Sequence, residues 1–78
     1  MPWNVKRDGS VLEVRIAAPV GSWGTLFDVV ERHLGDGLAA AVIPESIPNA
    51  PMIDIVILER LRTAVTNSGV DLLRPAFA

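Results

Sequence analysis

The side chains that could carry chemistry are few and scattered along the chain. There is one histidine, His33, and no cysteine, which excludes a thiolate nucleophile, a disulfide framework and a cysteine-ligated zinc site. His33 stands near the end of a predicted helix, just before Gly35, where it can interact with the last helical carbonyls while facing solvent. One histidine with dispersed carboxylates does not supply a set of zinc ligands. We therefore expect no metal and no cofactor.

Two carboxylates, Glu45 and Asp54, flank a proline-rich loop and could converge near the start of the second predicted helix. Asp54 also has a simpler interpretation, because negative charge is favoured in the first turn of a helix. Ser46, in the same loop, is expected to satisfy backbone groups. The segment Gly21–Gly24 precedes a helix and could form an anion site or a plain turn, but neither glycine-rich phosphate motif is present. The sequence thus predicts no enzyme.

Along the chain, segments with a strand-like pattern of apolar residues alternate with segments that have a helical pattern. Trp3, Val5 and the run 11–16 predict a hairpin around Asp8-Gly9, a pair that suits a type I′ turn. Apolar residues at helical spacing predict a first helix over 23–34. Ser22 is expected to cap its start, and the glycines at 35 and 37 to end it.

A continuous apolar run over 38–43 predicts a central strand covered on both faces. The stiff loop 44–51 follows, then a helix from Pro51 or Met52 to Asn67, which tolerates a proline at its first turn. A last strand is predicted over 70–73. The order ββαβαβ predicts one α/β domain over 1–78, with a small mixed sheet and both helices on one face.

Composition narrows the classes of partner. The net charge is −2, the isoelectric point is near 5.1, and the basic residues are scattered, which argues against nucleic-acid binding. The longest apolar run is far below the ~20 residues of a membrane span, and no signal peptide is visible, so we expect a cytoplasmic protein. A mean hydropathy of +0.38 is high for a small domain and predicts apolar surface that meets a partner.

Three stretches resemble the STAS domain of bacterial anti-sigma-factor antagonists and of sulfate-transporter tails. Residues 3–16 resemble its opening hairpin, residues 35–43 the approach to its central strand, and Met52-Ile53-Asp54 the motif before its regulatory serine. The resemblance implies a STAS-like fold and a non-catalytic regulatory role in protein assemblies.

The chain departs from the STAS pattern in two ways. Ile55 stands where the regulatory serine is expected, and Val56 and Ile57 follow in place of small residues. The chain also stops after its fourth predicted strand, where a typical member continues into another helix. The resemblance therefore implies a surface that is not switched by phosphorylation at this position.

The second predicted helix carries apolar residues on two sides. At about 100° per residue, residues 57, 58, 61, 64 and 65 share the core side, whereas Met52, Ile55 and Val56 share the opposite side with Glu59 and Arg62. Either the proline loop or the chain end covers these apolar residues, or they contact a partner. We expect a partner-binding surface made of Met52, Ile55, Val56, Glu59 and Arg62.

Two functions from different classes follow. The first is a non-catalytic protein-interaction module, a regulator or small accessory subunit whose partner is another protein or a second copy. The second is a small-ligand or lipid-binding domain with a pocket between the hairpin, Trp23 and the loop Pro44–Pro51, although that loop offers few polar groups, namely Glu45, Ser46 and Asn49.

Overall fold

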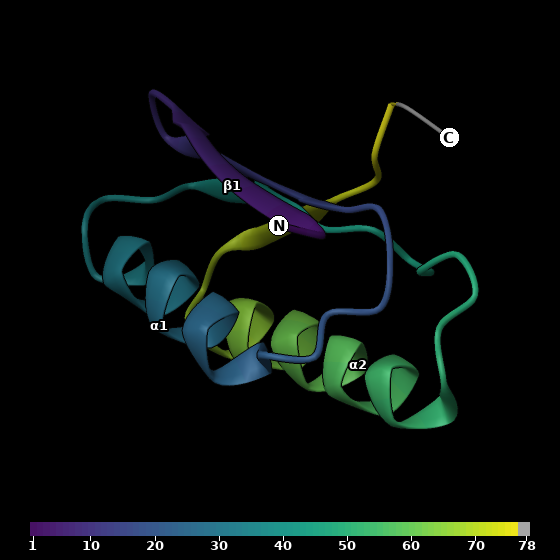
Figure 1. Cartoon of the computed structure of the whole chain (residues 1–78). Coiled ribbons are helices and arrows are strands. Elements are labelled where there is room, and N and C mark those ends of the chain that lie inside the picture. Colours follow the sequence, from purple (N-terminus) through teal and green to yellow (C-terminus); the bar gives the residue numbers. More distant parts are fainter. Residues whose placement is uncertain (77–78) are drawn as a thin grey trace.

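The computed structural model describes residues 1–76 and shows a four-stranded mixed sheet with two helices on one face (Figure 1). The elements follow the predicted ββαβαβ order. They are β1 (Trp3–Asp8), β2 (Val11–Ile16), α1 (Trp23–Leu34), β3 (Ala40–Val42), α2 (Met52–Asn67) and β4 (Asp71–Leu73).

The strands lie in the order β1-β2-β3-β4. The hairpin strands β1 and β2 are antiparallel, whereas β2, β3 and β4 run parallel to one another. Each parallel connection passes through a helix, as parallel pairing requires a crossover. The carboxyl ends of the three parallel strands therefore meet at one edge of the sheet, beside the start of α2.

The hydrophobic core lies between the helices and one face of the sheet. On β2, Leu12, Val14 and Ile16 are buried, and Leu12 is aligned with Ala41 of β3. From α2, Leu58, Leu61 and Val65 are buried at a spacing that keeps them on one side of a helix. Both helices cover the same face, and within residues 1–76 no helix covers the opposite face of the sheet (Figure 1).

Several local predictions need correction. The hairpin turn is formed by Gly9-Ser10 rather than Asp8-Gly9. Gly9 has φ +62° and Ser10 does not have a positive φ, which is the pattern of a type II′ turn, in which only the first central residue needs positive φ. Asp8 belongs to the strand.

The caps of the first helix also differ from the expectation. Ser22 holds the N-cap position but its side chain makes no capping hydrogen bond, and Gly35 ends the helix with φ −90°, outside the left-handed region. The left-handed conformation falls on Gly37, with φ +70°. The helix ends where expected, but by different backbone geometry.

The central strand is shorter and less covered than predicted. Regular pairing spans Ala40–Val42, and the preceding residue, Ala39, donates its N–H to the Ser10 carbonyl at 2.8 Å. Ala40 is buried on the helix-free face between Val11 and Asp71, its neighbours in register. A small side chain flanked by two strands is buried without a second layer.

Candidate functional site

The first two turns of α2 carry an unusual density of exposed apolar side chains. The exposed fractions are 72% for Met52, 60% for Ile53, 41% for Ile55 and 43% for Val56. Among residues 1–76 the only other exposed large hydrophobic residues are Met1 and Leu73. We call Met52, Ile53, Ile55 and Val56 the α2 patch.

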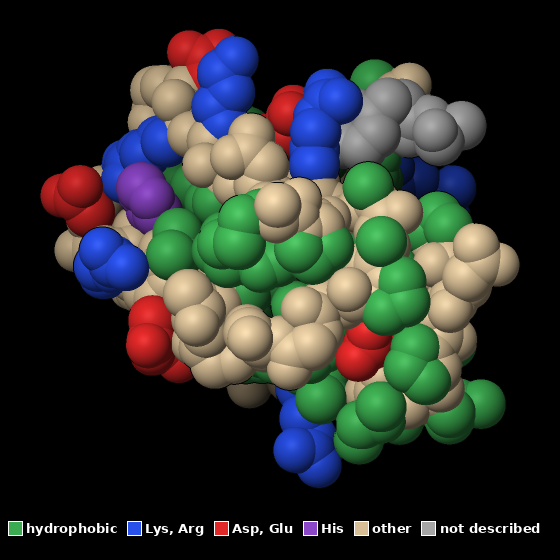
Figure 2. Space-filling view, viewed as in Figure 1, with side chains coloured by type: hydrophobic (Ala, Val, Ile, Leu, Met, Phe, Trp, Pro, Cys, Tyr) green, Lys and Arg blue, Asp and Glu red, His purple; other side chains and the backbone are tan. Residues whose placement is uncertain are grey.

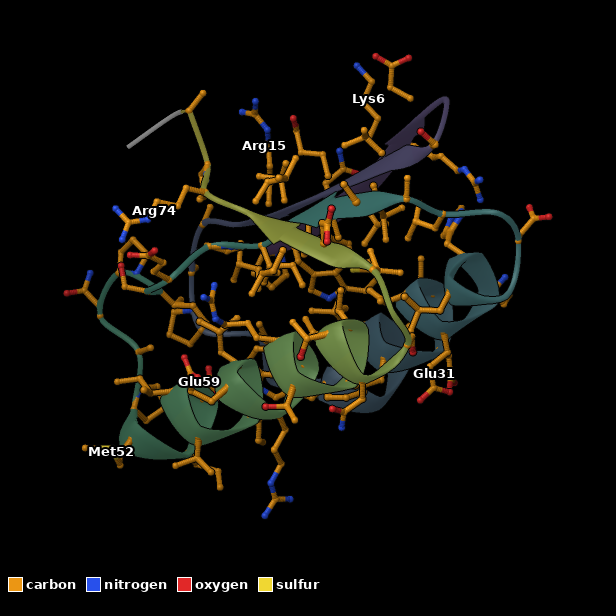
Figure 3. The ribbon with its side chains drawn as sticks, turned by 180° about the vertical axis from the view of Figure 1, so that it is seen from behind. Lys6, Arg15, Glu31, Met52, Glu59 and Arg74 are labelled. Atoms are coloured by element: carbon orange, nitrogen blue, oxygen red, sulfur yellow. The ribbon has the colours of Figure 1, made fainter. Side chains whose placement is uncertain are left out.

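The α2 patch lies at one end of the molecule. Figure 2 shows hydrophobic side chains gathered at the lower right, over the first turns of α2. Figure 3 labels Met52 there, at the same end as Arg74 and away from Glu31 of α1. The loop 44–51 leaves these side chains exposed, so it is not the cover that the sequence left open as an alternative. The chain end at 77–78 lies outside the described residues.

Asp54 anchors the helix turn that bears the patch. Its side chain points to the core and is 4% exposed. One carboxylate oxygen accepts from the Val20 backbone N–H at 3.0 Å, and the other accepts from the indole Nε1 of Trp23 at 2.9 Å. These bonds tie the start of α2 to the β2–α1 connection and to the first turn of α1. The α2 patch is therefore presented by a fixed turn of helix.

The two candidate carboxylates have different partners. The Asp54 carboxylate accepts hydrogen bonds from Val20 and Trp23, whereas the exposed Glu45 forms an ion pair with Arg74 at 3.4 Å. Sequence reasoning did not identify the buried acceptor role of Asp54, because the groups that it binds lie 34 and 31 residues away.

The polar residues of the predicted partner surface, Glu59 and Arg62, form contacts within the chain. Glu59 is exposed and pairs with Arg62 at 3.5 Å. The Arg62 side chain is only 21% exposed, and its Nη1 donates to the carbonyls of Ile43 and Pro44 at 3.3 and 3.4 Å. Arg62 thus fastens α2 to the end of β3 rather than lying among the patch side chains.

Ile53 is a member that the sequence analysis omitted. Ile53 is exposed, although at the ideal increment it lies 40° from Ile57 and 20° from Ala64, which the projection assigns to the core side. The helical projection alone therefore does not identify it. Ile57, expected in the core, is half-buried.

A cleft of about 630 Å³ lies at the carboxyl ends of the parallel strands. Its walls come from the end of β2, the loop between β3 and α2, and the residues after β4. The lining residues are Arg15, Ile16, Ala17, Pro44, Glu45, Ser46, Pro48, Arg74 and Pro75. Trp23 is not in this lining, which corrects the predicted pocket in that respect. Arg15 and Arg74 lie at this end of the sheet (Figure 3).

The remaining candidates form no further cluster. His33 is half-buried in the last turn of α1, and Ser22 is exposed. Within residues 1–76, no three acidic, histidine or cysteine side chains are grouped as a metal would require, and neither helix is long and apolar enough to cross a membrane.

Comparison of the chain with protein-family models, curated proteins and solved structures finds no match.

Proposed function

We propose that this chain is a non-catalytic protein-interaction module, a regulator or small accessory subunit that binds a protein partner through the α2 patch. The observation that carries the proposal is the exposure of four consecutive or near-consecutive large apolar residues at the start of one helix. Exposed apolar groups that lie together mark interaction surfaces more often than scattered ones do.

The chemistry of the α2 patch supports a protein partner. Methionine and branched aliphatic side chains adapt to and fill apolar pockets, and methionine is enriched in interface cores. Glu59 and the exposed Arg60 follow the patch along the helix, and a mixed-charge rim is typical around an apolar contact.

The resemblance to the STAS domain supports the same surface. The motif Met52-Ile53-Asp54 leads into Ile55, where the STAS pattern has its regulatory serine. With isoleucine there, the surface would be constitutively apolar rather than switched by phosphorylation. We propose a STAS-like regulatory role on this basis.

A substitution at Ile55 tests the proposal. The partner is first captured by affinity purification from the native host, identified by mass spectrometry and purified. Ile55→Asp should then weaken its binding by about thirty-fold or more, since loss of an interface hot spot costs about 2 kcal/mol. Folding should change by less than about 0.5 kcal/mol because the residue is exposed.

Two matched variants on the same helix complete this test. Thr63→Asp adds the same charge at an exposed position two turns along and should leave binding unchanged. Leu61→Asp places an unpaired charge in the core and should unfold the chain. Full affinity in folded Ile55→Asp would show that the partner binds elsewhere.

The cleft at the carboxyl ends of the parallel strands favours a second candidate function, that of a small-ligand-binding domain. Its volume falls in the range of ligand pockets, about 300–1,000 Å³, and open sheets commonly bind ligands beyond the carboxyl ends of parallel strands. Size-exclusion chromatography before and after organic extraction separates the candidates. A monomer that releases a small molecule supports ligand binding, whereas association through the α2 patch supports the interaction module.

A further inference from the structure

The strand β1 forms a long open edge of the sheet. Its only strand neighbour is β2, and Figure 1 shows β1 at the near edge with no element of the described chain beyond it. The other edge strand, β4, has three residues and is followed at once by Arg74 and Pro75. With six residues, β1 is the edge that can support regular pairing.

The hydrogen-bond phase of the hairpin identifies which backbone groups face outward. The Ala17 N–H donates to the Pro2 carbonyl at 2.8 Å, so this pair bonds across the ladder. Hydrogen-bonded pairs alternate with non-bonded pairs in an antiparallel ladder. From Pro2 onward, the residues of β1 whose N–H and C=O point away from β2 are therefore Trp3, Val5 and Arg7.

The side chains of this edge are also incompletely covered. Trp3 and Val5 pack against the core but are only partly buried. Figure 2 shows hydrophobic side chains gathered at the middle of this face, between the sheet above and α1 below. An added strand would satisfy the outward backbone groups and cover this apolar margin together.

We propose that β1 pairs antiparallel with β1 of a second copy of this chain, about a two-fold axis at Val5. Val5 then lies opposite itself and Trp3 lies opposite Arg7, so that outward groups bond to outward groups. Trp3 and Arg7 share the helix-covered side of the sheet. The Arg7 guanidinium donates in its plane to the Gly9 carbonyl and to Asp36, which leaves its planar face as the part that can pack on an indole. The two sheets become one continuous eight-stranded sheet.

Charge selects this register over its neighbours. On the open face, Lys6 lies opposite Asn4, and no like charges face each other. Sliding one strand by two residues toward the turn places Lys6 opposite Lys6, and a further slide places Arg7 opposite Arg7. Like charges directly opposite destabilise a strand pair. Sliding the other way leaves Arg7 and Asp8 outside the paired region.

Substitutions at Asn4 test the register. Asn4 is exposed. In the symmetric dimer each Asn4 lies opposite Lys6 of the other copy, so a substitution at Asn4 changes two contacts. Asn4→Glu should tighten the dimer and Asn4→Lys should weaken it, each by about tenfold, measured by sedimentation equilibrium over a wide concentration range. Equal dimer affinities for the two folded variants would overturn the register, and a wild-type chain that stays monomeric throughout would overturn the proposal.

Substitutions at Val5 test the edge itself. Val5→Pro removes an N–H that points away from β2, which an edge strand tolerates, and should abolish the dimer. Val5→Thr keeps the N–H and the β-branched shape and should retain it. If Val5→Pro dimerises normally but Ile55→Asp does not, the copies associate through the α2 patch and the β1 proposal is wrong. If Val5→Pro does not fold, the two Asn4 variants still decide the question.

Discussion

The carboxylate of Asp54 accepts a hydrogen bond from the indole nitrogen of Trp23 at 2.9 Å and joins the first turns of the two helices inside the core. Its second oxygen accepts from the Val20 N–H. A buried carboxylate is tolerated when hydrogen bonds satisfy it, and among residues 1–76 no buried polar side-chain atom lacks a partner. The position of the α2 patch depends on this arrangement.

We expect Asp54→Ala to lower the free energy of unfolding by about 2–6 kcal/mol, because it leaves two buried donors unsatisfied at about 1–3 kcal/mol each. Urea denaturation checks this value. Asp28→Ala, at an exposed position of α1, is the control and should change stability by less than about 0.5 kcal/mol.

A double-mutant cycle assigns part of this effect to the Asp54–Trp23 pair. Trp23→Phe removes the indole donor while keeping an aromatic ring. A coupling free energy near zero between Asp54→Ala and Trp23→Phe would mean that the two side chains do not stabilise each other.

The hairpin turn gives a second prediction. Gly9 has φ +62°, and a β-branched residue there is strained, so Gly9→Val should cost about 1–3 kcal/mol. Asp8→Val separates the observed turn from the type I′ turn that the sequence suggested. Asp8 is an exposed strand residue, where valine is well accepted, so its melting temperature should stay close to that of the wild type.

If Asp8→Val were as destabilising as Gly9→Val, the turn would be centred on Asp8-Gly9 instead. The thermal melts of these two variants are therefore sufficient to identify the central residues of the turn.

The sequence predicts the elements well where periodicity and breakers agree. The first helix has apolar residues at helical spacing between a glycine–serine start and Gly35, and its bounds 23–34 match the structure. The second helix is bounded by Pro51 and Ser68 and also matches. From the run 38–43 we predicted a strand that is longer than the observed one and covered on both faces. The prediction was wrong because an apolar run alone does not reveal how many faces of a sheet the helices will cover.

The candidate site is only partly predictable, for a physical reason. Exposure of Met52, Ile55 and Val56 follows from the local helical angle and was predicted. The roles of Asp54 and Arg62 depend on groups brought near by tertiary structure, the Val20 N–H and the carbonyls of Ile43 and Pro44. A helical projection shows which side a residue faces, but not what lies there.

Arg62 gives the last prediction. Its guanidinium donates to two carbonyls at the end of β3 and pairs with Glu59. Arg62→Ala should therefore lower the free energy of unfolding by about 1 kcal/mol, a value reduced from that of buried charged hydrogen bonds because the bonds are long and solvent reaches the side chain. The matched control is Arg60→Ala, an exposed arginine on the same helix, which should change stability by less than about 0.5 kcal/mol. Partner affinity should fall less in Arg62→Ala than in Ile55→Asp, because Arg62 acts on the fold and Ile55 on the contact. The reverse order, with both variants fully folded, would return Arg62 to the binding surface that the sequence predicted.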